Sequence, residues 1–122
     1  MTVTLSGNSS VTLTVEVPPA LQGTPVLFVE ASALRNPRGA RVYVEVYLEG
    51  ADGREHELGN FTFYGMTREA DKQAFAFSLE PVQRQALVVS EIARVRAAMK
   101  PFDASGDISD VRVDLQAWIE VR

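Results

Sequence analysis

The sequence contains no cysteine and only one histidine, His56, among its 122 residues. Without thiols the chain can form no disulfide, no thiolate zinc site and no cysteine nucleophile, and the redox compartment is left undecided. A histidine site for copper or zinc generally needs several imidazoles, so one histidine would have to be completed by another chain. We therefore interpret His56 as an exposed strand residue, with Glu55 and Glu57 on the opposite face of that strand.

Runs of basic residues and long apolar runs are also missing. The net charge is −4, and no cluster of Lys or Arg forms the positive stripe that a phosphate backbone requires, which argues against nucleic acid as a partner. The first residues, "MTVTLSGNSS", show neither a basic segment nor the apolar segment of a signal peptide. No apolar run approaches the roughly 20 residues of a membrane helix. A cytoplasmic location without membrane insertion is the expectation.

Signatures of catalysis are absent as well. No "GxSxG" elbow accompanies the single histidine, and "GADG" is a hairpin turn because no Lys-Ser/Thr pair follows it as in a phosphate loop. The segment "DASGDISD" lacks the central glycine and final glutamate of a calcium loop, so we interpret its carboxylates as Asx turns and caps. The carboxylates of this segment belong to Asp103, Asp107 and Asp110, and Asp114 follows four residues after its end. We expect no enzyme activity, cofactor or metal.

What the sequence does contain is alternation of apolar and polar residues. Apolar residues make up 46% of the chain and charged residues 23%, and the length fits one domain, residues 1–122. Runs with a period of two predict strands near residues 11–17, 25–34, 42–48, 54–63, 75–79 and 111–121. The turn "RNPRG" separates the second run from the third. Six or more strands in this length predict an antiparallel β-sandwich of jelly-roll-like type.

One segment is expected to depart from this pattern. Val88, Ile92, Val95 and Met99 recur at helical spacing, Ser90 is a candidate N-cap, and Pro101 ends the pattern. These signals predict a short amphipathic helix near residues 90–100.

Aromatic residues provide the candidate contact sites. In "LGNFTFYGMTREADKQAFAF" the phenylalanines alternate with polar residues and are expected in the core. Tyr64 and Met66 lie where the aromatic strand meets a polar turn, either buried or presented as a plug for another protein's pocket. Tyr43, Tyr47 and Trp118 face outward, either as a partner-binding surface or packed under the helix or a loop.

The pattern "RVYVEVYLEG...HELGNFTFYGM...QAFAFSLEPV...VRVDLQAWIEV" resembles the C-terminal β-sandwich domain of tyrosinases, polyphenol oxidases and catechol oxidases. That family has a strand of the type "xVFVNLP", a "GSFxxFG" strand with its turn, a "FxFDVTxxL" strand and a valine-rich last strand. Residues 59–65 match the second element and residues 75–79 the third. The first and last elements correspond to residues 41–48 and 111–121, so the resemblance spans roughly residues 11–122.

The resemblance implies a non-catalytic, regulatory domain that packs over the dicopper site of an oxidase domain, on the same or a separate chain. Such a domain inserts a placeholder side chain into the substrate entrance and keeps the enzyme latent; Tyr64 and Met66 are candidates by their place at the loop. Two alternatives stay open. The chain could self-associate through the face of Tyr43, Tyr47 and Trp118 or through an edge strand, as a homo-oligomer. The same face could instead bind a sugar, with Glu45, Arg112 and Glu120 as candidate polar partners.

Overall fold

The computed structural model describes residues 2–18, 23–50, 53–80 and 92–122. Within these ranges the chain forms eight β-strands and no helix. The strands are β1 (Val3–Ser6), β2 (Ser10–Glu16), β3 (Pro25–Arg35), β4 (Val42–Glu49), β5 (Glu55–Thr62), β6 (Gln73–Ser78), β7 (Ile92–Pro101) and β8 (Arg112–Val121). All six strand runs predicted from the sequence are present.

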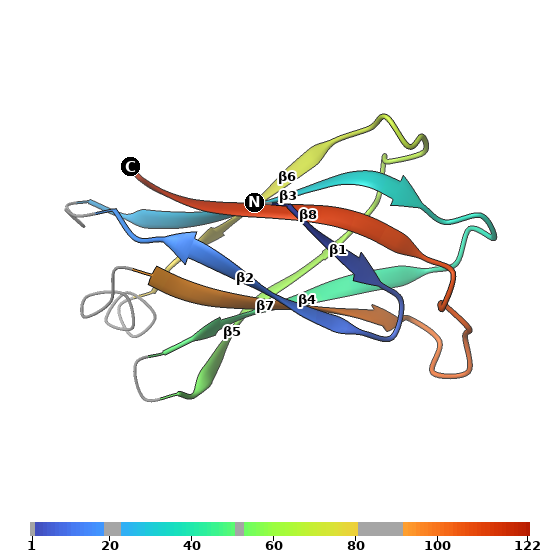
Figure 1. The fold of residues 1–122 in the computed structure, drawn as a ribbon, viewed down its shortest axis with the longest axis horizontal. Helices are drawn as coiled ribbons and strands as arrows, with labels where there is room; N and C mark the ends of the chain where they lie inside the picture. Colours follow the sequence, from blue (N-terminus) through green and yellow to red (C-terminus); the bar gives the residue numbers. More distant parts are fainter. Residues whose placement is uncertain (1, 19–22, 51–52, 81–91) are drawn as a thin grey trace.

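The strands form two antiparallel sheets, in the orders β1-β8-β3-β6 and β2-β7-β4-β5. Strands of the first half of the chain pair with strands of the second half: β1 with β8, β2 with β7, β3 with β6 and β4 with β5. The chain therefore runs as one long hairpin. The hairpin is rolled up so that β3 also pairs with β8, and β4 with β7. Figure 1 shows β3 and β8 in the upper sheet and β4 and β7 in the lower one.

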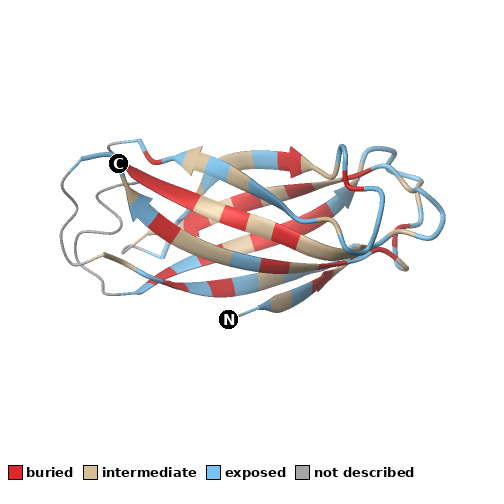
Figure 2. Cartoon of the chain, turned by 90° about the horizontal axis from the view of Figure 1, so that it is seen from above, coloured by how far each residue is buried: buried red, intermediate tan, exposed pale blue. Residues whose placement is uncertain are grey.

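Side chains from both sheets meet in one apolar core, a sandwich-like arrangement. Strand β4 shows the pattern most clearly, because Val42, Val44, Val46 and Leu48 are buried while the residues between them are partly exposed. Figure 2 shows a similar alternation of buried and more exposed residues along several other strands. A period of two places alternate side chains on opposite faces of a strand. The period of two predicted for the strand at residues 42–48 is confirmed.

The phenylalanines beside the polar turn close one side of the sandwich. Strands β5 and β6 are edge strands of different sheets, and the rings of Phe61 and Phe75 stack between them, with centroids 4.1 Å apart. Phe61 is buried, and Phe63, Phe75 and Phe77 are partly buried against the core. The sequence-based prediction that these phenylalanines belong to the core is confirmed.

The predicted helix near residues 90–100 is wrong for the residues that the structure describes there. Strand β7 occupies Ile92–Pro101, paired with β2 on one side and β4 on the other. Ala93, Val95, Ala97 and Met99 are buried at a period of two. Two of the four residues that indicated a helix, Val95 and Met99, are four apart, a spacing that fits both periods. Val88 and the candidate cap Ser90 lie outside the described residues.

Besides β7, neither β1 nor the bulge in β3 was predicted from the sequence. Strand β1 is only four residues long, and its partner β8 lies more than a hundred residues away in sequence. Strand β3 contains a bulge between Ser32 and Arg35, where Ala33 has a φ of +50°. Leu27, Val29 and Ala31 face inward, so regular alternation would turn Leu34 outward. The bulge shifts the alternation by one residue, and Leu34 packs against the core.

Candidate functional site

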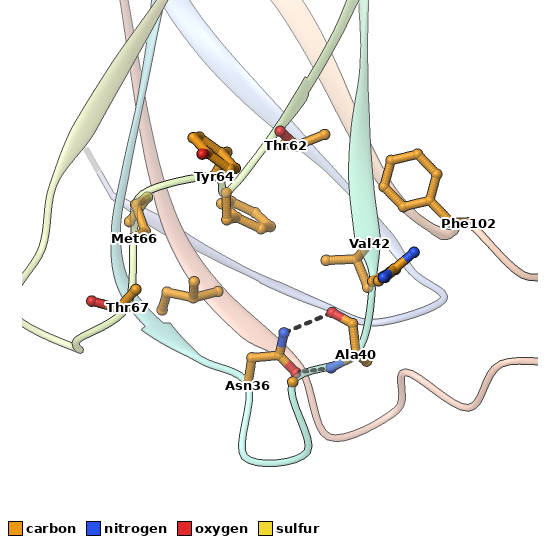
Figure 3. A pocket seen from close by; sticks show the side chains of 12 residues that line it. Asn36, Ala40, Val42, Thr62, Tyr64, Met66, Thr67 and Phe102 are labelled. Carbon is orange, nitrogen blue, oxygen red and sulfur yellow. Dashed lines mark hydrogen bonds between the residues drawn. The ribbon is translucent and has the colours of Figure 1, made fainter.

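Three loops surround a cavity of about 670 Å³ at one end of the molecule. The loops are residues 36–41 between β3 and β4, residues 63–72 between β5 and β6, and residues 102–111 between β7 and β8. Figure 3 shows Met66 and Thr67 on one side of the cavity and Val42 and Phe102 on the other. We call this region the loop-end site. The remaining lining residues are Leu34, Asn36, Gly39, Ala40, Arg41, Thr62, Phe63 and Tyr64.

Tyr64 is the most exposed large apolar residue among those described, at 91%. It occupies a tight turn in which the Met66 amide donates a hydrogen bond of 2.9 Å to the Phe63 carbonyl. Gly65 follows Tyr64 with a φ of +88°, a conformation that a residue with a side chain rarely adopts. Met66, only 7% exposed, belongs to the core. Of the two candidate plugs, Tyr64 projects and Met66 anchors the turn.

The rest of this loop is held by one carboxylate. Asp71 accepts hydrogen bonds of 2.9 Å from the backbone amides of Thr67 and Arg68. These bonds lower the pKa of Asp71 because they favour its charged form. Arg35, at the end of β3, forms an ion pair of 3.1 Å with Glu69. The loop that carries Tyr64 is therefore tied both to itself and to the neighbouring strand.

The loop between β3 and β4 is closed by an amide side chain. Asn36 accepts from the Ala40 amide at 2.9 Å and donates to the Ala40 carbonyl at 2.8 Å. Arg38 then reaches the neighbouring loop, donating to both carboxylate oxygens of Asp110 at 2.7 and 3.0 Å and to the Asp107 carbonyl at 3.1 Å. Bidentate pairing of this kind fixes geometry as well as charge. Two of the loops are thus joined to each other.

The loop between β7 and β8 contains the Asx turns that the sequence predicted. Asp103 accepts from the Ser105 amide, and Asp107 accepts from the Ser109 amide, each at 3.0 Å. Bonds from the serine two residues further along lower the pKa of both carboxyl groups. Ile108, at the centre of the loop, is buried in the core. The Asp103–Asp107 segment is therefore a folded turn of its own.

The Arg38–Asp110 ion pair predicts a pH dependence. Hydrogen bonding to Arg38 lowers the pKa of Asp110, so this pair stabilises the fold above the carboxyl group's unfolded pKa of about 4. The contribution is lost as the pH falls through the lower, folded pKa. We expect Asp110→Asn to lower the melting temperature at pH 7 by no more than a few degrees, because the pair is exposed. Thermal melts between pH 7 and pH 2 should show wild type and variant converging.

Asp114→Asn is the matched control. Asp114 accepts a hydrogen bond of 2.7 Å from the Thr4 hydroxyl and forms no ion pair among the described residues. The same substitution there should leave no comparable gap at pH 7. A gap for Asp110→Asn that persists unchanged at pH 2 would contradict the role of the ion pair.

The three outward aromatic residues do not form one surface. Tyr43 and Tyr47 lie on β4 and Trp118 on β8, on the outer faces of different sheets. No described helix covers them. Tyr43 contacts Phe102, with ring centroids 5.2 Å apart, and so extends the rim of the loop-end site. The structure brings Tyr43 to this site and leaves Tyr47 and Trp118 elsewhere.

Tyr47 takes part in a charged network on its sheet. The Arg96 guanidinium lies 4.3 Å from the centre of the Tyr47 ring and donates to Glu55 at 2.6 and 3.0 Å. The Tyr47 hydroxyl donates to Glu45, which raises the pKa of Tyr47 because the bond favours the protonated phenol. One face of this ring is therefore already occupied by the protein's own cation.

Trp118 is likewise engaged by its neighbours. Its ring stacks on Phe28, 5.6 Å away and tilted by 13°, and its indole nitrogen donates to Glu120 at 3.0 Å. The Arg122 guanidinium lies 5.0 Å from the Phe28 ring centre. A sugar stacks on an open ring face, and here ring faces pack against each other and against a cation. Arg112 carries no described contact with this group and belongs to the far end of β8.

His56 lies in β5, as predicted, but it is half-buried rather than exposed. It pairs with Leu48, an inward residue of β4, while Glu55 and Glu57 pair with outward residues. Across the described ranges, no three His, Cys, Asp or Glu side chains gather closely enough to hold a metal ion. The described residues also contain no helix suited to crossing a membrane.

Sequence reasoning missed Arg41, Leu34 and Phe102 as parts of this site. Phe102 is 60% exposed, and its amide donates to the Arg41 carbonyl at 3.1 Å, which fixes it beside the cavity. Phe102 directly follows the last residue of β7, a position from which its place in a loop could have been predicted. The preceding residues were interpreted as a helix, so this prediction was not made. Leu34 depends on the β3 bulge, for which the sequence offers only the turn residues that follow.

Comparison with known proteins does not assign this chain to a family. No protein-family model matches the sequence, and no curated protein matches it. The resemblance to the tyrosinase C-terminal domain therefore stays a prediction from the sequence.

Proposed function

We propose that this chain is a non-catalytic binding domain whose loop-end site docks onto a larger protein, with Tyr64 as the anchor. The exposure of Tyr64 carries this proposal. A large aromatic side chain that is 91% exposed on a tight turn, next to a buried anchor residue, is well placed for insertion into a pocket of another protein. Aromatic residues are enriched among the few that dominate binding energy.

The rigidity of the three loops supports the same proposal. Arg38, Asn36 and Asp71 each fix a loop through hydrogen bonds to its neighbour or to its own backbone. A surface ordered before binding loses less conformational entropy when it docks. Exposed Phe102 and half-buried Tyr43 extend the apolar area beyond Tyr64.

We propose as partner the catalytic domain of a dicopper phenol oxidase, on the same chain or another, which this domain keeps latent. The choice of partner rests on the sequence resemblance, through the "GNFTFYG" turn that carries Tyr64. In this role the chain needs no metal or cofactor of its own, because it covers the partner's substrate entrance.

The test mixes the purified chain with such a catalytic domain. Light scattering after size exclusion measures the complex, and diphenol oxidation is followed in the same samples. We expect a complex with suppressed oxidation. Tyr64→Ala should weaken the complex by about 30-fold or more, as for an interface hot spot, and restore oxidation.

Tyr47→Ala is the matched control, since it removes a tyrosine from a surface away from the loop-end site. It should leave both binding and suppression unchanged. Absence of a complex, or equal effects of the two substitutions, would overturn the proposal. A stable homo-oligomer of the chain alone, with no effect on the oxidase, would instead favour self-association.

We also propose that the fold is a jelly roll. A jelly roll is an eight-stranded double-sheet fold, and this chain has two four-stranded sheets. The pairing of each strand in the first half with its counterpart in the second half supports that assignment.

A further inference from the structure

The loop-end cavity has the size and lining of a small-molecule site. Its volume, about 670 Å³, falls within the usual range for ligand pockets of about 300–1,000 Å³. The lining is mostly apolar and includes three aromatic residues, Phe63, Tyr64 and Phe102. A few polar groups beside such a lining select the ligand.

The charge of the cavity lining is positive. Arg41 is the only charged residue among the twelve that line the cavity, although the chain as a whole carries a net charge of −4. Six arginines elsewhere form ion pairs: Arg35, Arg38, Arg68, Arg94, Arg96 and Arg122. Within the described ranges, the Arg41 side chain has no carboxylate partner. An exposed guanidinium beside an apolar cavity favours an anion, and its planar fork fits a carboxylate.

The other polar side chains of the lining indicate which groups of a ligand could bind there. Both ends of the Asn36 amide are engaged by Ala40, so this residue shapes the wall and offers little to a ligand. Among the described residues, no hydrogen bond joins the hydroxyl group of Thr62, Tyr64 or Thr67 to another group. They can donate to a carboxylate or accept from a hydroxyl group.

We propose that the loop-end cavity binds a small aromatic carboxylate, whose ring lies among the aromatic side chains and whose carboxylate pairs with Arg41. This binding goes beyond the proposed docking function and requires no partner protein. A planar ring suits the lining because aromatic rings gain from stacked or edge-on contacts with one another.

Cinnamate is the probe, titrated into the isotope-labelled chain while backbone amide signals are followed by NMR. The amides of Gly39 and Gly65 flank the cavity and should shift in a saturable way. The amides of Gly23 and Gly53, which lie away from the cavity lining, should not. The dissociation constant should be on the order of 1 mM or tighter for a ligand of this size. Cinnamyl alcohol, which lacks the charge, should bind at least about tenfold more weakly.

Arg41→Gln should weaken cinnamate binding at least about tenfold, whereas Lys100→Gln makes the same charge change outside the lining and should leave it unchanged. Thr67→Trp fills the cavity mouth from an exposed position and should abolish binding without altering the charge. Thermal melts would establish that each variant is folded. Shifts spread over both ends of the molecule, equal affinity for the alcohol, or an unchanged constant in Arg41→Gln or Thr67→Trp would each overturn the proposal.

Because the chain is studied alone, these outcomes are separate from the docking test. Loss of cinnamate binding in both variants with intact oxidase docking would establish a ligand site independent of the partner. Docking that fails while cinnamate binds as described would leave this site in place and remove only the proposed partner.

Discussion

Gly7→Ala is expected to destabilise the protein by about 3 kcal/mol or more, because there is no room for a methyl group at this position. A Cβ atom on Gly7 would lie 1.6 Å from the Ile108 carbonyl oxygen and 2.5 Å from its carbonyl carbon. Both contacts are with backbone, which cannot rotate away as a side chain can. The Gly7 amide also donates to the Val111 carbonyl at 2.9 Å, so the turn between β1 and β2 is held directly against the 102–111 loop.

Urea unfolding followed through the single tryptophan, Trp118, would measure this loss. Gly53→Ala is the matched control: Gly53 has a φ of +77°, but a methyl group there would meet no atom within 4 Å. That substitution should cost only the strain of the left-handed backbone, about 1–2 kcal/mol. Equal unfolding midpoints for the two variants would contradict the steric account of Gly7.

Leu115→Ala should cost about 3–5 kcal/mol, the range for truncating a fully buried leucine. Leu115 is 0% exposed and lies in β8, opposite Val3 of β1 and Ala31 of β3. Removal of the leucine side chain would leave a cavity in the core next to β8. The neighbouring strands β1 and β3 are held by pairing with β8, so they cannot easily move to fill it. We expect the midpoint of urea unfolding to fall accordingly.

Gln116→Ala tests the next position of the same strand, on its outer face, and should change stability by no more than about 0.5 kcal/mol. If Leu115→Ala does not fold, Leu115→Val supplies a smaller truncation, with an expected loss of about 1 kcal/mol. Leucine and glutamine substitutions of equal effect would show that β8 is not buried on one side as described.

The strands could be predicted where a period of two is long and unmixed. Residues 42–49 and 111–121 are of this kind, and the structure follows them closely. The segment 92–101 was predicted as a helix because the spacing of Val95 and Met99 fits the period of a helix as well as that of a strand. It forms a strand because it pairs with β2 and β4, and this pairing cannot be read from the sequence alone. Strand β1 was missed for the same reason, since a four-residue strand is stabilised by its distant partner.

The candidate site was predictable only in part. Tyr64 stood out because a large aromatic residue preceded a glycine at a polar turn, and the structure places it in the open. Met66 shares that turn, but its burial depends on how the loop folds back onto the core. Tyr47 and Trp118 could not be assigned to different faces without the sheet order. Arg41 and Phe102 meet only because two loops far apart in sequence lie side by side.

The rolled hairpin has a consequence for synthesis on the ribosome. Strand β8 is made after the other seven, yet it lies inside its sheet, between β1 and β3. Until residues 112–121 have left the exit tunnel, β1 has no partner and β3 can pair only with β6. The emerging chain therefore exposes unpaired strand edges and apolar faces, which favour aggregation. The sheet β2-β7-β4-β5 can form once β7 has emerged, whereas the sheet β1-β8-β3-β6 is complete only after the eighth strand has emerged.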